Sequence, residues 1–142
     1  MKMISKLVLA FAVLAVSSCA SMPDWMPGSG AIKVSLTGSE AVPPLSVPGS
    51  GSGSFRVAAD GTLAGSVTTK DVAGTMAHIH RAAKGTNGPV IVPLDKNGDT
   101  YSVPAGRKLT QQQMDDLKAG NLYVNVHTAR NKGGEVRGQL QP

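Results

Sequence analysis

Residues 122–140 read LYVNVHTARNKGGEVRGQL, and this stretch decides the fold. Leu122, Val124 and Val126 alternate with Tyr123, Asn125 and His127, which is the period of two expected of a half-buried β-strand. The turn NKGG at residues 131–134 leads into a second alternating run over residues 135–140. Two such runs joined by a glycine-bearing turn predict an antiparallel strand pair at the end of the chain.

The same period of two recurs upstream. Residues 32–37, 63–69, 75–81, 89–94 and 100–103 are predicted strands, and a further strand around Phe55 and Val57 leads into the hairpin turn Asp60-Gly61. Residues 40–53, EAVPPLSVPGSGSG, are rich in Pro, Gly and Ser and predict a long loop.

One short helix is predicted between the strands. Thr110 and Gln113 have the spacing of a capping box, and Gly120 stands where a helix C-terminus often ends. Seven to eight short strands with one short helix predict an all-β, antiparallel β-sandwich with Greek-key-like connections.

The first residues predict export and lipidation. Lys2 and Lys6 precede an apolar run over residues 7–16, which is shorter than the roughly 20 residues that span a bilayer. The sequence Val-Ser-Ser-Cys at residues 16–19 is similar to a bacterial lipobox. We therefore expect a signal peptide over residues 1–18, a lipidated Cys19 and a tether over residues 19–30.

Ala20 follows the cysteine, at the position where an aspartate would favour retention in the inner membrane. We therefore expect the lipidated protein at the outer membrane, facing the periplasm. Ordinary signal cleavage beside a free thiol is the alternative.

Residues 31–142 then make one domain of ordinary size. After removal of the signal peptide, 12 basic residues remain against nine acidic ones. This mild charge, without a basic cluster interleaved with aromatics, argues against nucleic acid as a partner. The sequence contains no P-loop and no evident pairing of a nucleophile with a base, so we do not expect an enzyme.

The three histidines of the chain fall in two predicted strands. Alternation places His78 and His80 on one face of residues 75–81 and His127 on the polar face of residues 122–128. Residues two apart on a strand lie about 6.6 Å apart, so two imidazoles can share an ion, and a third from a neighbouring strand completes the set. Met76 on the same face is a candidate fourth ligand that favours reduced copper. The alternative is that these histidines only hydrogen-bond the backbone of nearby turns.

Four segments together resemble the CHRD domain, named after chordin, an extracellular antagonist of bone morphogenetic proteins. They are HIH at residues 78–80, GTNGPV at 85–90, LYVNVHT at 122–128 and GGEVRGQ at 133–139. The resemblance covers residues 31–140 and implies a secreted domain. Animal members of the family suggest protein binding.

The strand His78-Ile79-His80 also resembles the copper strand of copper–zinc superoxide dismutases, with His127 similar to a third copper ligand. The sequence lacks a bridging histidine, further zinc ligands and a cysteine pair. The zinc site is therefore not carried over, and dismutase activity is not expected. Arg137 has no assured match to the anion-guiding arginine of those enzymes, and we expect it to be a surface or salt-bridge residue.

The sequence thus predicts a copper-binding protein of the cell envelope, with His78, His80 and His127 as ligands for Cu(I) or Cu(II) and zinc as the alternative metal. Its role would be to capture, buffer or deliver copper. Its partners would be the metal, the membrane through the lipid anchor and, as an open alternative, a second copy sharing the metal. A metal-free interaction module, using residues 40–53 or a strand edge, is the second hypothesis. A copper redox enzyme is the third.

Overall fold

The computed structural model describes residues 30–142. The predictions of a signal peptide, a lipidated Cys19 and a tether therefore lie outside the described residues, apart from Gly30. The strands are β1 (Ile32–Thr37), β2 (Ser50–Val57), β3 (Leu63–Lys70), β4 (Gly74–Arg81), β5 (Val90–Pro93), β6 (Asp95–Asn97), β7 (Thr100–Ser102), β8 (Leu122–Thr128) and β9 (Val136–Leu140). A 3₁₀ turn, η1 (Gly38–Glu40), and one helix, α1 (Gln111–Lys118), complete the described elements.

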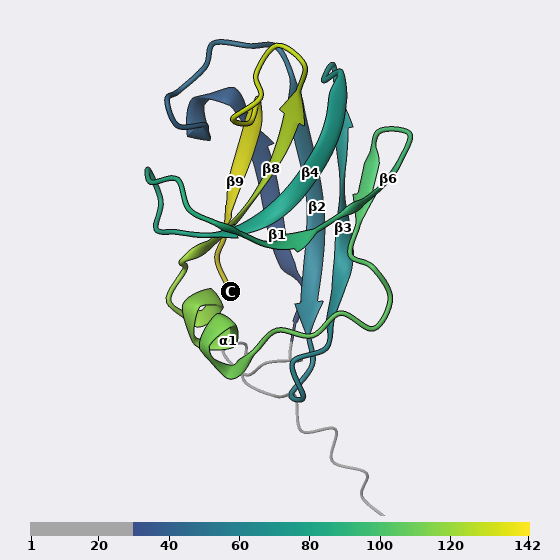
Figure 1. The fold of residues 1–142 in the computed structure, drawn as a ribbon, viewed down its shortest axis with the longest axis vertical. Coiled ribbons are helices and arrows are strands. Elements are labelled where there is room, and N and C mark those ends of the chain that lie inside the picture. Colours follow the sequence, from purple (N-terminus) through teal and green to yellow (C-terminus); the bar gives the residue numbers. More distant parts are fainter. Residues whose placement is uncertain (1–29) are drawn as a thin grey trace, which may run out of the picture.

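All strands belong to one antiparallel sheet in the order β5-β4-β8-β9-β1-β2-β3-β7-β6. The two ends of this order, β5 and β6, follow each other in the chain with only Leu94 between them. The Leu94 N–H donates to the carbonyl of Ala77 on β4, so the far edge of the sheet returns to its beginning. The sheet therefore folds over into the predicted β-sandwich, with β4, β8 and β9 facing β1, β2 and β3 (Figure 1).

The two halves of the sheet join where β9 runs beside β1. Thr37 pairs with Arg137 in this seam. A side chain at Gly138 would collide with the carbonyl oxygen of Ser35 and with the methyl of Val34, so only glycine allows β9 to approach β1 this closely. Arg137 therefore pairs with a residue on each side of β9, with Thr37 on β1 and with Asn125 on β8.

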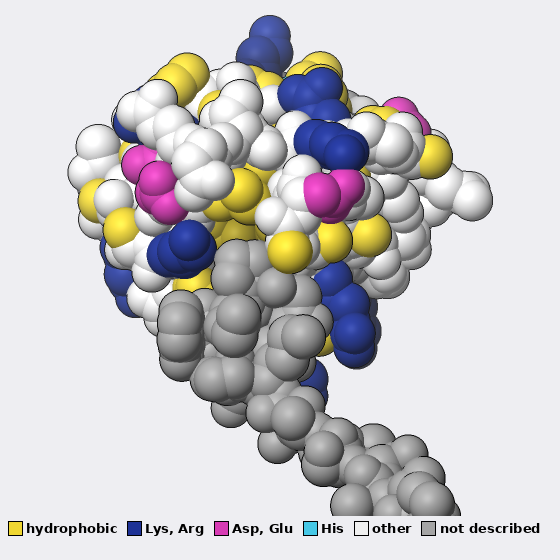
Figure 2. Space-filling view, turned by 90° about the horizontal axis from the view of Figure 1, so that it is seen from below, with side chains coloured by type: hydrophobic (Ala, Val, Ile, Leu, Met, Phe, Trp, Pro, Cys, Tyr) yellow, Lys and Arg dark blue, Asp and Glu magenta, His cyan; other side chains and the backbone are white. Residues whose placement is uncertain are grey.

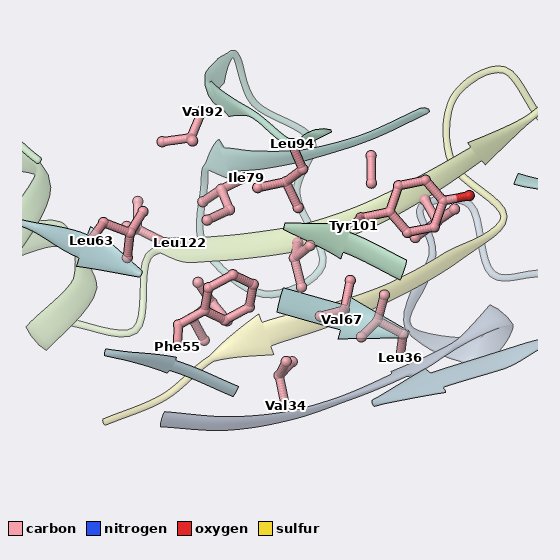
Figure 3. Close-up of a cluster of buried hydrophobic side chains, with 14 of the residues drawn as sticks. Val34, Leu36, Phe55, Leu63, Val67, Ile79, Val92, Leu94, Tyr101 and Leu122 are labelled. Atoms are coloured by element: carbon pink, nitrogen blue, oxygen red, sulfur yellow. The ribbon is translucent and has the colours of Figure 1, made fainter. Parts of the chain in front are cut away.

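The core lies between the two layers of the sandwich. Alternate residues from both layers point inward and meet, among them Phe55, Val67 and Leu36 from one side and Ile79 from the other (Figure 3). The core cluster runs from Val34 to Leu140, so the described domain contains its own hydrophobic interior. On β4 and β8 it takes Ala77, Ile79, Leu122, Val124 and Val126, the same apolar faces that alternation predicts.

The predicted helix is confirmed in detail. The Thr110 hydroxyl accepts from the Gln113 N–H, and the Gln113 side chain accepts from the Thr110 N–H, which completes the capping box. Met114 and Leu117 are buried, so α1 closes the lower end of the sandwich (Figure 1). Seen from below, that end mixes acidic, basic and apolar side chains, and no histidine side chain is visible on it (Figure 2).

Two predictions about the strands need correction. The segment predicted as a loop over residues 40–53 ends earlier, because β2 begins at Ser50 and its Ser-Gly repeats pair with β1 on one side and β3 on the other. Gly53 would collide with the backbone of Val67 if it had a side chain, so the glycines there serve close strand packing rather than loop flexibility. The described strands number nine rather than seven to eight, since residues 95–97, for which no strand was predicted, form the short strand β6.

No helix within residues 30–142 combines the length and apolar character that crossing a lipid bilayer requires.

Candidate metal centre

The histidines lie on the outer face of β4, β8 and β9. The register pairs Met76 with His127, His78 with Asn125 and His80 with Tyr123. Directly paired residues share a face, so all six of these side chains point away from the core. On the next strand, Asn125 pairs with Arg137 and Tyr123 with Gln139, which extends the same polar face to β9.

This register brings the three imidazoles together. One possible ligand nitrogen from each of His78, His80 and His127 lies within 4.8 Å of the others. The closest pair, His78 Nδ1 and His127 Nε2, is 3.0 Å apart. Metal–nitrogen bonds of about 2 Å place nitrogens on one ion roughly 3.3–3.5 Å apart, so small rotations of the side chains bring all three into range. The three histidines are therefore compatible with a metal site.

Backbone carbonyls fix the orientation of two imidazoles. His80 Nδ1 lies 2.9 Å from the carbonyl oxygen of Gly88, and His127 Nδ1 lies 2.7 Å from that of Lys132. A carbonyl oxygen can only accept, so Nδ1 carries the proton in both rings. In the neutral ring Nε2 then holds a free lone pair, which is the arrangement in which ligand histidines are commonly held by their surroundings.

The free nitrogen of His80 has no hydrogen-bond partner within residues 30–142. His80 is only 7% exposed, so water has little access to the ring. Its Nε2 is buried and makes no hydrogen bond with the described residues. An unpaired buried nitrogen is costly, and a metal ion would satisfy it. His127 Nε2 by contrast faces His78, whose Nδ1–H donates to it. A metal bound at His78 Nδ1 would replace this proton.

Burial also favours the neutral form of His78 and His80, the form that can bind a metal. Burial lowers the pKa of His78, and the imidazoles of His127 and His80 lower it further. Burial lowers the pKa of His80 as well, while its hydrogen bond to Gly88 acts in the opposite direction. Both rings therefore stay neutral down to a lower pH than a free histidine would, and a neutral ring keeps one nitrogen lone pair that can bind a metal.

The site is more enclosed than alternation indicated. His78 and His127 are half-buried, as expected of an outer face, but His80, Tyr123 and Asn125 are buried. Although all three histidines lie on outer faces, only His78 and His127 are therefore partly exposed. The reason is the segment 82–89, which folds back over the outer face instead of extending into solvent.

Arg137 anchors this covering segment, and the expectation of a surface or salt-bridge residue is wrong. It is 2% exposed, and within residues 30–142 no carboxylate lies at ion-pair distance from it. Its guanidinium donates to the carbonyls of Thr86 and Ala83 and to the side chains of Asn87 and Gln139. These contacts satisfy a buried cation with neutral acceptors.

Met76 and Val90 border the histidines on the same face. Met76 pairs with His127 across β4 and β8, and Val90 pairs with His80 across β4 and β5. They are the exposed large hydrophobic residues of the described chain, at 50% and 48% exposure. Met76 thus places an exposed thioether side chain directly opposite His127.

Fold and site together define a class: a β-sandwich domain that carries a histidine cluster on the outer face of one layer, beneath a covering loop. Residues 32–140 match the model of the CHRD domain, and the chain belongs to the CHRD domain family. No curated protein matches the chain. No solved structure matches it either.

Sequence reasoning found the three histidines but missed the two residues behind them. Tyr123 and Arg137 alternate on the polar faces of their strands, and this was visible in the sequence. Their proximity to His80 depends on the pairing of β4 with β8 and of β8 with β9, which sequence alternation does not specify.

Proposed function

We propose that this protein binds copper at the cell envelope through His78, His80 and His127, and that it captures, buffers or delivers the metal. The observation that carries the proposal is the buried Nε2 of His80, which has no hydrogen-bond partner in the described part of the chain, beside the His78–His127 pair. Imidazole nitrogen suits copper and zinc. A set of three neutral histidines adds no negative charge, which suits an ion of low charge.

Copper is favoured over zinc for two reasons. Divalent copper binds a given nitrogen site more tightly than zinc does. Met76, opposite His127, offers a soft thioether that suits the cuprous ion. The half-buried His78 and His127 would leave the metal accessible from one side, as exchange with a donor or acceptor requires. Zinc is the alternative metal.

The envelope location rests on residues 1–20 and on the family. We propose that Cys19 is lipidated and that the domain is held at the outer membrane, facing the periplasm. Membership of the CHRD family supports an extracellular module. A non-enzymatic role is proposed, with copper redox chemistry as its alternative.

A second candidate is a metal-free interaction module. Met76 and Val90 favour it, because both are exposed and apolar and lie on one face. In this reading the histidines hydrogen-bond the backbone and one another, and the covering segment 82–89 shapes a contact surface.

The first experiment is an anaerobic titration of residues 20–142 with Cu(I) against a colorimetric cuprous chelator. The variants His78→Ala, His80→Ala and His127→Ala test the ligands. Thr68→Ala, at an exposed position on the distant strand β3, is the matched control. A parallel titration with Zn(II) compares the metals.

One tight equivalent per chain that each histidine variant weakens and Thr68→Ala retains supports the proposal. Half an equivalent supports a copper ion shared between two copies. Binding that survives in all three histidine variants contradicts the assigned ligands, and no competition with the chelator by the wild-type domain contradicts copper binding and favours the interaction module.

A further inference from the structure

His80, Tyr123 and Arg137 form a stack of three side chains. The Tyr123 ring is parallel to the His80 imidazole, with an interplanar angle of 6° and ring centroids 4.8 Å apart. On Tyr123 the Arg137 guanidinium carbon lies 3.5 Å from the ring centroid. A buried cation on an aromatic face is attracted by the ring electrons, so contact with the guanidinium restricts the movement of the Tyr123 ring. His80 therefore packs against a ring that is itself held from behind.

Arg137 also holds the loop that orients His80. Its guanidinium donates to the carbonyls of Ala83 at 3.2 Å and Thr86 at 2.9 Å, both in the segment 82–89. The same segment supplies the Gly88 carbonyl that accepts from His80 Nδ1. The Gly88 N–H in turn donates to the Tyr123 hydroxyl at 3.2 Å. The His80 imidazole thus contacts both Tyr123 of the stack and Gly88 of the loop.

The loop has little freedom at this point. A side chain at Gly88 would collide with the carbonyl oxygen of Arg81, so the chain turns back tightly there. Lys84 pairs with Glu40 at 3.0 Å, and Asn87 donates to the Val42 carbonyl, but the residues of both contacts are at least partly exposed to solvent. Arg137 is the buried anchor, and a planar guanidinium can serve two carbonyls and a ring at once where a lysine ammonium cannot.

We infer that Arg137 is a positioning residue that, through Tyr123 and the loop 82–89, holds His80 with Nδ1 protonated and Nε2 directed at the metal position. The inference deepens the proposed function and rests on it for its biological meaning. Its structural part concerns the metal-free protein and can be tested without copper. Arg137 touches no candidate ligand position itself and contacts the groups named above rather than His80, and, in addition to burial, its positive charge lowers the pKa of His80.

The test uses residues 20–142 labelled with ¹⁵N, without metal at pH 7.5. Long-range ¹H–¹⁵N correlation spectra report which ring nitrogen of each histidine carries the proton. The chain has three histidines, so single His→Ala variants assign every signal. The variant is Arg137→Met, which keeps length but removes the charge and all donors. Arg56→Met, at an exposed position of β2, controls for loss of an arginine.

The expected result is an Nδ1-protonated His80 in the wild type and in Arg56→Met, and a mixture of both tautomers in Arg137→Met. Loss of such an outer partner typically weakens metal binding 10–100-fold, so Cu(I) affinity should fall by roughly that factor. If Arg137→Met fails to fold, Arg137→Lys should show a smaller change in the same direction. Thermal unfolding of each variant identifies the folded ones.

An unchanged His80 tautomer together with unchanged Cu(I) affinity in a folded Arg137→Met protein overturns the inference. A change of tautomer in a protein whose wild type binds no copper supports the positioning role and contradicts the proposed function instead. The two failures are therefore distinguishable.

Discussion

At the scale of single residues, hydrogen bonds decide which ring nitrogens of the histidine cluster carry protons. The carbonyl oxygens of Gly88 and Lys132 keep the proton of His80 and His127 on Nδ1, so that Nε2 of each ring carries a lone pair. The third ring, His78, uses its proton to bond His127. Neighbouring groups thus arrange the imidazoles of the metal-free cluster, and acid should disturb this arrangement through His78 and His80.

The stability of the metal-free domain should fall as pH drops below about 6.5, the pKa of histidine in an unfolded chain. The folded-state pKa values of His78 and His80 are lowered, so between the folded and unfolded values the unfolded chain binds more protons, and acid favours unfolding. Urea denaturation at pH 7.5, 6.0 and 5.0 measures this.

The double variant His78→Ala, His80→Ala is the control for the pH experiment. It should lose less stability between pH 7.5 and 5.0 than the wild type, because fewer lowered histidine pKa values remain. Equal slopes in both proteins would assign the acid sensitivity to other groups.

At the scale of elements, each part of the site has a separate support. Strand β4 supplies two histidines and β8 supplies one, while the segment 82–89 covers them. Helix α1 closes the end of the sandwich and contributes none of the residues of the histidine cluster. Helix and site should therefore be separable by mutation.

Thr110→Ala should lower the free energy of unfolding by about 1 kcal/mol and leave Cu(I) affinity unchanged. The substitution removes the hydroxyl that accepts from the Gln113 N–H, a typical helix-capping loss. Urea denaturation and the chelator titration measure the two quantities. Gln111→Ala, an exposed position in the same helix, is the control and should cost only a few tenths of a kcal/mol. A marked loss of affinity in Thr110→Ala would show that α1 and the site are coupled.

At the scale of the whole molecule, a metal on the three histidines would link two neighbouring strands of one layer. β4 and β8 are consecutive in the sheet but more than 40 residues apart in sequence. In the unfolded chain the three histidines are not held together, so a metal that binds them should stabilise the folded state, and more so the tighter it binds.

Free Cu(I) at 100 times its Kd should stabilise the domain by about 2.7 kcal/mol, which corresponds to a Tm increase of roughly 10 °C for a domain of this size. Calorimetry with copper buffered by a chelator, under anaerobic conditions, measures the shift. His127→Ala should show little increase under the same conditions, because it removes the candidate ligand that β8 supplies. A similar increase in His127→Ala would locate the stabilising copper elsewhere.

The sequence by itself determined which residues face the core and which face outward. Alternation is a local property of an extended backbone, so it correctly placed Ile79, Val124 and Val126 inside and the three histidines outside. Helix capping is local too, and the Thr110–Gln113 pair was read correctly for the same reason. The CHRD segments identified the family, which the match over residues 32–140 confirms.

Only the tertiary structure decided how the outward residues meet. The register that pairs His80 with Tyr123 and Asn125 with Arg137 depends on contacts between segments far apart in the chain. The burial of His80 and Arg137 depends on the loop 82–89 folding back over the sheet, since an outward face in a strand pattern is exposed only when nothing covers it. Sequence periodicity describes one strand at a time, whereas the environment of a side chain is set by its neighbours in space.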